Sequence, residues 1–185
     1  MRRHLIHHYQ VNTAWTGNAG TGTSGPKACS GNHALLVEGK PPLPGSADPA
    51  FPGGAGRSTP EELLIAALSA CHMLWYLHLA AREHVIVQAY TDRASGTLVT
   101  PPGGAGYFSE VTLRPTVSVP AATRLAQVHA LHRRARALCS VARPVRFPVH
   151  CEPAIELVRG DPAPAAAYAG DATEQAAAHS EGEPA

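Results

Sequence analysis

The chain has 185 residues, of which 44% are hydrophobic and 16% charged, a composition typical of a globular protein long enough to bury a core. Its formal net charge of +1 argues against general nucleic-acid binding, and four cysteines are too few for a disulfide scaffold. No run of about 18 apolar residues is free of charge and His, and no signal peptide is recognisable, so we expect no membrane span and a cytoplasmic location.

The first third of the chain predicts short strands joined by loops. Residues 8–15 are rich in β-forming side chains and alternate weakly, which indicates a strand. Residues 33–37 predict a second strand. Residues 39–57 are rich in Gly and Pro and predict a long loop, a feature that is often functional in a compact domain.

A helix start follows, and it is the clearest local signal in the sequence. Thr59 fits the N-cap, Pro60 the first helical position, and Glu62 completes a capping box. Residues 63–81 are apolar on almost every side, which predicts a buried helix that ends near residues 82–84.

Beyond this helix the pattern returns to strands. Residues 85–99 predict a β region, residues 103–106 a glycine turn, and residues 111–119 a half-buried strand in which Pro115 indicates an edge or a bulge.

A second helix is predicted over residues 121–138 and a last strand over residues 145–158. The helix has an apolar stripe that we expect to face inward, made of Leu125, Val128, Leu131, Ala135 and Leu138. Its arginines, Arg133, Arg134 and Arg136, are expected to face outward. The order of elements favours an α+β fold with antiparallel sheet. We expect one domain over residues 1–158 and a disordered tail of Ala, Pro and acids over residues 159–185.

Two cysteines stand out by position. Cys71 lies in the middle of the apolar helix and Cys139 at the end of the second helix, and each alone is typical of a small core residue. Two such thiols could meet across the helix pair. His72 is a poor base for Cys71 because neighbouring helical residues project about 100° apart, which argues against a Cys/His hydrolase.

Eleven histidines raise the question of a metal site. His129 and His132 are three residues apart, and His72 and His78 flank Trp75, but no Cys-x-x-Cys or His-Glu-x-x-His pattern exists. We therefore predict that His129 and His132 lie on a polar helix face. We expect no metal, and no nucleotide or flavin because no phosphate-binding loop is present.

Four segments, in this order and spacing, form a recognisable pattern: Thr16–Gly25, Thr59–Leu64, Ala66–Leu79 and Leu138–Cys139. The pattern resembles the OsmC/Ohr family of osmotically inducible and organic hydroperoxide resistance proteins, over about residues 7 to 154. The resemblance implies an intertwined homodimer in which the sheet wraps around a long central helix.

The resemblance also implies a chemistry, the thiol-dependent reduction of peroxides, with a preference for organic hydroperoxides over hydrogen peroxide. It makes Cys71 the nucleophile and Cys139 the resolving thiol, with a lipoyl protein or a small dithiol as reductant. Cys29 and Cys151 have no counterpart in it, and Cys151 is the alternative resolving partner.

Glu61 matches the glutamate of the family's active site, although helix-dipole stabilisation is its simpler interpretation. Glu61 and Cys71 are ten residues apart, or about 15 Å along one helix. A shared site would form most easily where two such helices cross antiparallel in a dimer. Arg57 is our choice for the cation that pairs with the glutamate, with Lys27 and Lys40 as alternatives.

An alternative hypothesis is that the chain belongs to the same family but has no catalytic activity. The chain would then be a stress protein that binds a hydrophobic ligand at the dimer interface, in a pocket lined by Met73, Trp75 and Tyr76. We favour core packing for these three side chains.

Overall fold

The computed structural model of the chain describes residues 4–48, 54 and 56–159. Two helices and nine strands lie in this part of the chain, which confirms the α+β class. Most of the predicted tail, residues 160–185, falls outside the described residues.

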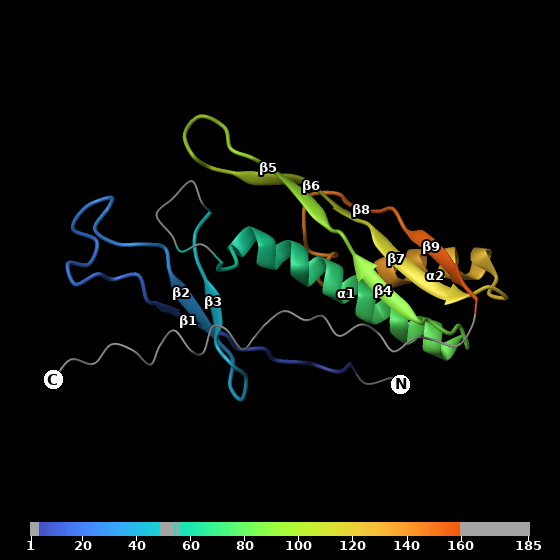
Figure 1. The fold of residues 1–185 in the computed structure, drawn as a ribbon. Coiled ribbons are helices and arrows are strands. Elements are labelled where there is room, and N and C mark those ends of the chain that lie inside the picture. The colour runs from blue at the N-terminus through green and yellow to red at the C-terminus, as the bar shows by residue number, and fades with distance from the viewer. Residues whose placement is uncertain (1–3, 49–53, 55, 160–185) are drawn as a thin grey trace.

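A small antiparallel sheet lies beside the N-terminal end of α1 (Figure 1). Its strands, in sheet order, are β1 (Asn12–Trp15), β2 (His33–Leu36) and β3 (Leu43–Gly45). The first strand is shorter than predicted, and the predicted loop 39–57 contains β3. Pro44 pairs within β3, which is an edge strand, where the missing N–H of proline is tolerated.

The helix α1 (Pro60–Arg82) begins as the sequence predicts. The Thr59 side-chain oxygen accepts a hydrogen bond from the Glu62 N–H at 3.2 Å, and the Glu62 carboxylate accepts one from the Thr59 N–H at 2.9 Å. Two N–H groups that the helix leaves unpaired are thereby satisfied, and Glu83 caps the other end.

Replacing Thr59 with Ala is expected to lower the free energy of unfolding by about 1 kcal/mol, because the Glu62 N–H loses its acceptor. Thr59→Ser keeps that acceptor and is the matched control. Urea unfolding of both variants measures the difference, and equal stability of the two would show that the cap contributes nothing.

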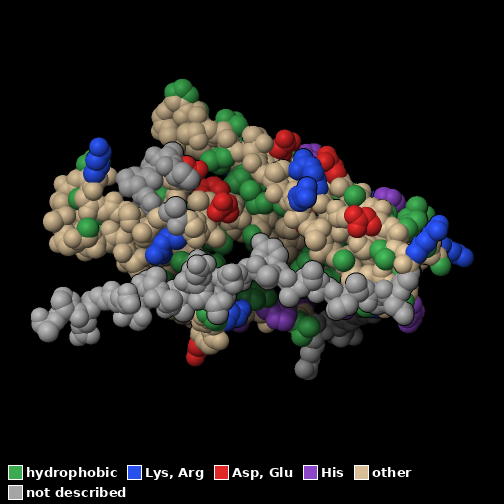
Figure 2. Space-filling view, viewed as in Figure 1, with side chains coloured by type: hydrophobic (Ala, Val, Ile, Leu, Met, Phe, Trp, Pro, Cys, Tyr) green, Lys and Arg blue, Asp and Glu red, His purple; other side chains and the backbone are tan. Residues whose placement is uncertain are grey.

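Only one side of α1 is buried, which corrects the expectation of a helix buried all round. The buried residues are Leu68, His72, Tyr76, Leu79 and Ala80. Leu74 remains 62% exposed. By length and composition alone α1 would also pass as a membrane span, but its buried side packs in the protein core. Apolar side chains therefore reach the surface along α1, in the middle of the face shown in Figure 2.

The six remaining strands form two three-stranded sheets, the two halves of one ribbon, which bends where each strand of one sheet passes within a few residues into a strand of the other. One half, in sheet order, is β4 (Ala89–Asp92), β7 (Pro115–Pro120) and β9 (Ala154–Val158). The other half is β5 (Ser95–Val99), β6 (Tyr107–Leu113) and β8 (Val149–Cys151). The first two strands of each half pair antiparallel, but β6–β8 and β7–β9 pair parallel, so each half is mixed rather than wholly antiparallel.

Arg114 holds the three strands together where the ribbon bends. Its N–H donates to the Asp92 carboxylate at 2.7 Å, and its guanidinium donates to Ser95 Oγ at 2.7 Å and to Glu152 at 3.1 Å. Pro115 opens β7 just beyond the bend. Of the two predicted alternatives, the edge strand is wrong, because β7 is the central strand of its sheet. The strand is instead interrupted at Arg114, and proline is tolerated as the first residue of β7.

The second helix, α2 (Leu125–Leu138), starts four residues later than predicted and packs against α1. Val128, Leu131 and Ala135 are buried in the larger core cluster, as predicted, whereas the end residues Leu125 and Leu138 are 45% and 43% exposed. The three arginines face outward.

Candidate functional site

The structure brings the two helical thiols together. Cys71 is half-buried on α1, and Cys139 is buried at the C-cap of α2, where its N–H donates to the Ala135 carbonyl. The two thiols lie close enough to interact. Burial, followed by the neighbouring Cys71 thiol, raises the pKa of Cys139 to about 11, so Cys139 is a neutral thiol at physiological pH.

The predicted glutamate and cation lie apart from this pair. Glu61 is in the first turn of α1, and since α1 is continuous, it is about 15 Å from Cys71 along the axis. Its Oε2 is buried and has no hydrogen-bond partner among the described residues. Arg57 is half-buried in the loop before α1, beside Gly54, while Lys27 and Lys40 are exposed.

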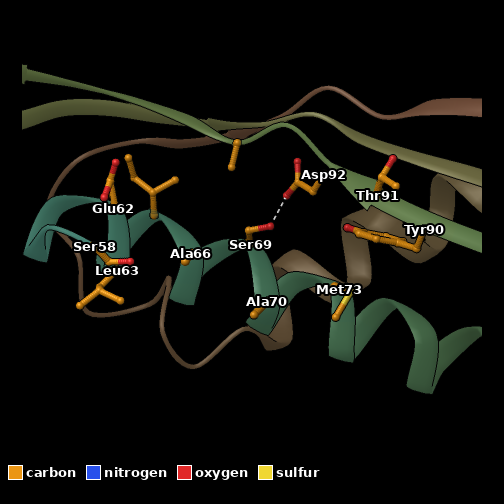
Figure 3. A pocket seen from close by; sticks show the side chains of 12 residues that line it. Ser58, Glu62, Leu63, Ala66, Ser69, Ala70, Met73, Tyr90, Thr91 and Asp92 are labelled. Carbon is orange, nitrogen blue, oxygen red and sulfur yellow. Dashed lines mark hydrogen bonds between the residues drawn. The ribbon is translucent and has the colours of Figure 1, made fainter. Parts of the chain in front are cut away.

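A groove of about 690 Å³ runs between α1 and β4 (Figure 3). Ser69 on α1 donates to the Asp92 carboxylate on β4 at 2.6 Å across it. The other lining residues are mostly apolar: Ser58, Glu62, Leu63, Ile65, Ala66, Ala70, Met73, Tyr90, Thr91 and Ala94. The Ser69–Asp92 pair was not predictable from the sequence, because it joins positions 23 residues apart on different elements.

Beside the thiol pair lies a cluster that the sequence did not reveal. His72 Nε2 on α1 is 3.1 Å from His132 Nδ1 on α2 and 3.6 Å from Cys151 Sγ on β8. The prediction that His132 lies on a polar helix face is wrong, since it is 3% exposed and stacks on the Tyr76 ring at 4.1 Å. A signal existed, because His132 follows Val128 by four residues and therefore shares its inner face.

Burial keeps both imidazoles of this cluster neutral. Desolvation lowers the pKa of His72, and desolvation together with the neighbouring His72 and His129 lowers the pKa of His132 to about 3. The thiol of Cys151 has a pKa raised to about 11, mainly by burial and then by the Asp92 carboxylate.

Acidification is expected to destabilise the protein through His132. Below about pH 6.5 the unfolded chain binds a proton that the folded His132 does not bind until about pH 3. The free energy of unfolding therefore falls as pH decreases through this window, by at most about 1.4 kcal/mol per pH unit for this group. Urea unfolding at pH 7, 6 and 5 should show a shallower slope for His132→Gln than for the wild type. His129→Gln, one turn earlier and exposed, should keep the wild-type slope.

Comparisons with known proteins identify the family to which this fold belongs. Residues 53–153 match the family model described as OsmC-like protein. No curated protein matches the chain. Among solved structures, an OsmC-like protein of unknown function from Vibrio cholerae is 28% identical with a TM-score of 0.73, over 80% of this chain and 99% of that one.

Two structures named as organic hydroperoxide resistance proteins share the fold at lower identity. The protein from Legionella pneumophila is 16% identical with a TM-score of 0.57, over 82% of this chain and 100% of that one. The protein from Elizabethkingia anophelis is 15% identical with a TM-score of 0.59, over 83% and 100%. Because the family model spans more than half of the sequence and the fold agrees, the chain belongs to the OsmC-like protein family.

Proposed function

We propose that this protein reduces organic hydroperoxides through Cys71 and Cys139, in keeping with the family-level redox role of its relatives. The observation that carries the proposal is the pair of adjacent thiols, formed by two helices from distant parts of the chain. A half-buried thiol with a buried thiol at its side is the arrangement that a sulfenic acid needs for rapid capture.

The cycle consumes one hydroperoxide and two electrons from an external dithiol. The Cys71 thiolate attacks the terminal peroxide oxygen, the O–O bond breaks, and the alkoxide takes a proton and leaves as alcohol. Cys71 is then a sulfenic acid. Cys139 sulfur attacks the Cys71 sulfur, its proton leaves with the hydroxide as water, and a disulfide forms. A dithiol reduces this disulfide by exchange and is itself oxidised to a disulfide.

The raised pKa of Cys139 fits the resolving role. A thiol that stays protonated is a weak nucleophile toward peroxide, so the less buried Cys71 is the thiol that reacts first. Cys151, which the sequence left as an alternative resolving partner, contacts His72.

We also propose a cytoplasmic homodimer in which two α1 helices cross antiparallel. The uncovered apolar side of α1 supports a partner there. So does Glu61, whose buried Oε2 has no partner among the described residues. In this arrangement Glu61 of one copy would approach Cys71 of the other, and Arg57 would supply the cation.

The test is a peroxidase assay on the full chain with cumene hydroperoxide or hydrogen peroxide and with dithiothreitol or a dihydrolipoyl reductant. We expect consumption of the organic peroxide to be faster than that of hydrogen peroxide. Cys29→Ser, which removes a thiol remote from the pair in sequence, should match the wild type. Peroxide that persists with every reductant would refute the proposal.

A second function is favoured by the groove along α1. Its mostly apolar lining and volume of about 690 Å³ suit a hydrophobic ligand. Met73 lines it, whereas Tyr76 is fully buried and belongs to the core. A binder would take up a fluorescent fatty acid equally well as wild type and as Cys71→Ser, and would turn over no peroxide.

A further inference from the structure

We propose that His72, His132 and Cys151 form a binding site for one divalent transition-metal ion of the zinc class. The three residues come from α1, α2 and β8, and their ligand atoms all lie within 4.8 Å of one another. His72 and His132 are buried and Cys151 is half-buried. This proposal is separate from the peroxidase cycle, which uses a different thiol pair.

Two separations between the ligand atoms match the edges of a zinc tetrahedron. With Zn–N near ~2.05 Å and Zn–S near ~2.3 Å, tetrahedral geometry puts two nitrogens ~3.3 Å apart and a nitrogen ~3.6 Å from a sulfur. The observed separations are 3.1 Å for His72 Nε2 to His132 Nδ1 and 3.6 Å for His72 Nε2 to Cys151 Sγ. Three such ligands with water in the fourth position make an open zinc site.

The cluster is poorly satisfied by hydrogen bonds alone. A neutral imidazole offers one donor and one acceptor, and His132 Nδ1 already faces His72. Its Nε2, on the other side of the ring, is buried and has no hydrogen-bond partner among the described residues, so Nδ1 is the nitrogen that would bind the ion. Unprotonated imidazoles are also the form that binds metal.

A small cavity adjoins two of the three ligand side chains, and both histidines can turn toward a shared ion. A cavity of about 10 Å³, lined among others by His72, Cys139 and Cys151, adjoins the cluster, and this is roughly the space of one water. The two imidazole planes lie 6° apart and face each other edge to edge. Rotation about the soft terminal torsion of each histidine would aim both nitrogens at one centre.

The charge balance of binding is simple. The ion displaces the proton of the Cys151 thiol, so Zn²⁺ enters and one H⁺ leaves, while both histidines stay neutral. The Asp92 carboxylate acts on His72 and Cys151 and favours the cation, and Arg136 acts on both in the opposite sense.

The experiment titrates chelator-treated full-length protein with ZnCl₂ by calorimetry and counts bound ions by native mass spectrometry. We expect one ion per chain, with Cys151→Ser and His132→Gln each weakening binding more than about 100-fold. Cys29→Ser and His129→Gln are matched controls that should bind as the wild type does. A variant with His7→Gln and His8→Gln tests adventitious binding at the exposed N-terminal histidines.

Cobalt keeps the proposal falsifiable if the cluster variants fold poorly. Co²⁺ bound to wild type should show a thiolate-to-cobalt charge-transfer band and tetrahedral d–d bands. The same spectrum should persist in the double variant Cys71→Ser, Cys139→Ser, so the result does not depend on peroxidase activity. The proposal fails if wild type binds no ion, if the cobalt spectrum lacks the thiolate band, or if binding is lost only with His7 and His8.

Discussion

Replacing Cys71 with Ser is expected to lower the rate of organic hydroperoxide reduction more than about 10³-fold, because the hydroxyl is not a nucleophile at neutral pH. Cys71 is half-buried on α1, and Ser occupies slightly less space without breaking the helix. Fold and stability should therefore change little. Steady-state peroxide consumption with a dithiol measures the loss, and circular dichroism checks the fold.

Cys139→Ser separates the two proposed thiol roles. It should leave the first turnover intact, because Cys71 still attacks peroxide, but block formation of the disulfide. Repeated turnover with a dithiol should slow, and the Cys71 sulfenic acid should oxidise further under excess peroxide. A Cys71→Ser variant that retains wild-type turnover, or a Cys139→Ser variant that loses the first turnover, would contradict the assignment.

The largest loss of stability is expected from Leu131→Ala. Leu131 is fully buried in the cluster that joins α1, α2 and the sheet, so truncation removes apolar contacts and leaves a cavity. We expect a decrease of about 3 kcal/mol in the free energy of unfolding.

Leu125→Ala is the matched control for this prediction. It makes the same chemical change on the same helix, at a side chain that is 45% exposed. Its effect should stay below about 1 kcal/mol. Urea unfolding of both variants gives the comparison, and equal losses would show that the helix packs differently from the structure described.

Local signals predicted the helices well and the sheet less well. The start of α1 follows from Thr59, Pro60 and Glu62 because capping depends only on neighbouring residues. The parallel pairing of β8 and β9 was not predictable, because it depends on which distant strand each one meets. The bend at Arg114 likewise depends on contacts with Asp92, Ser95 and Glu152, which are distant in sequence.

The thiol pair could be predicted from the sequence, whereas the histidine cluster could not. Cys71 and Cys139 were identifiable because the family resemblance covers both, and the structure brings them together. His72, His132 and Cys151 follow no ligand motif, since each lies on a different element and the packing of α1 on α2 and β8 unites them. The exposed side of α1 was also unexpected, because an apolar helix does not show which of its sides packs in the core of the same chain.

The most direct test of the central claim is the intact mass of the protein after one equivalent of an organic hydroperoxide. We expect the wild type to lose about 2 Da as a disulfide forms, and Cys139→Ser to gain about 16 Da as a sulfenic acid. The mass of Cys71→Ser should not change. A wild-type mass that stays constant while the peroxide persists would contradict it, and Cys71 would then be a core residue in a protein that binds rather than turns over its ligand.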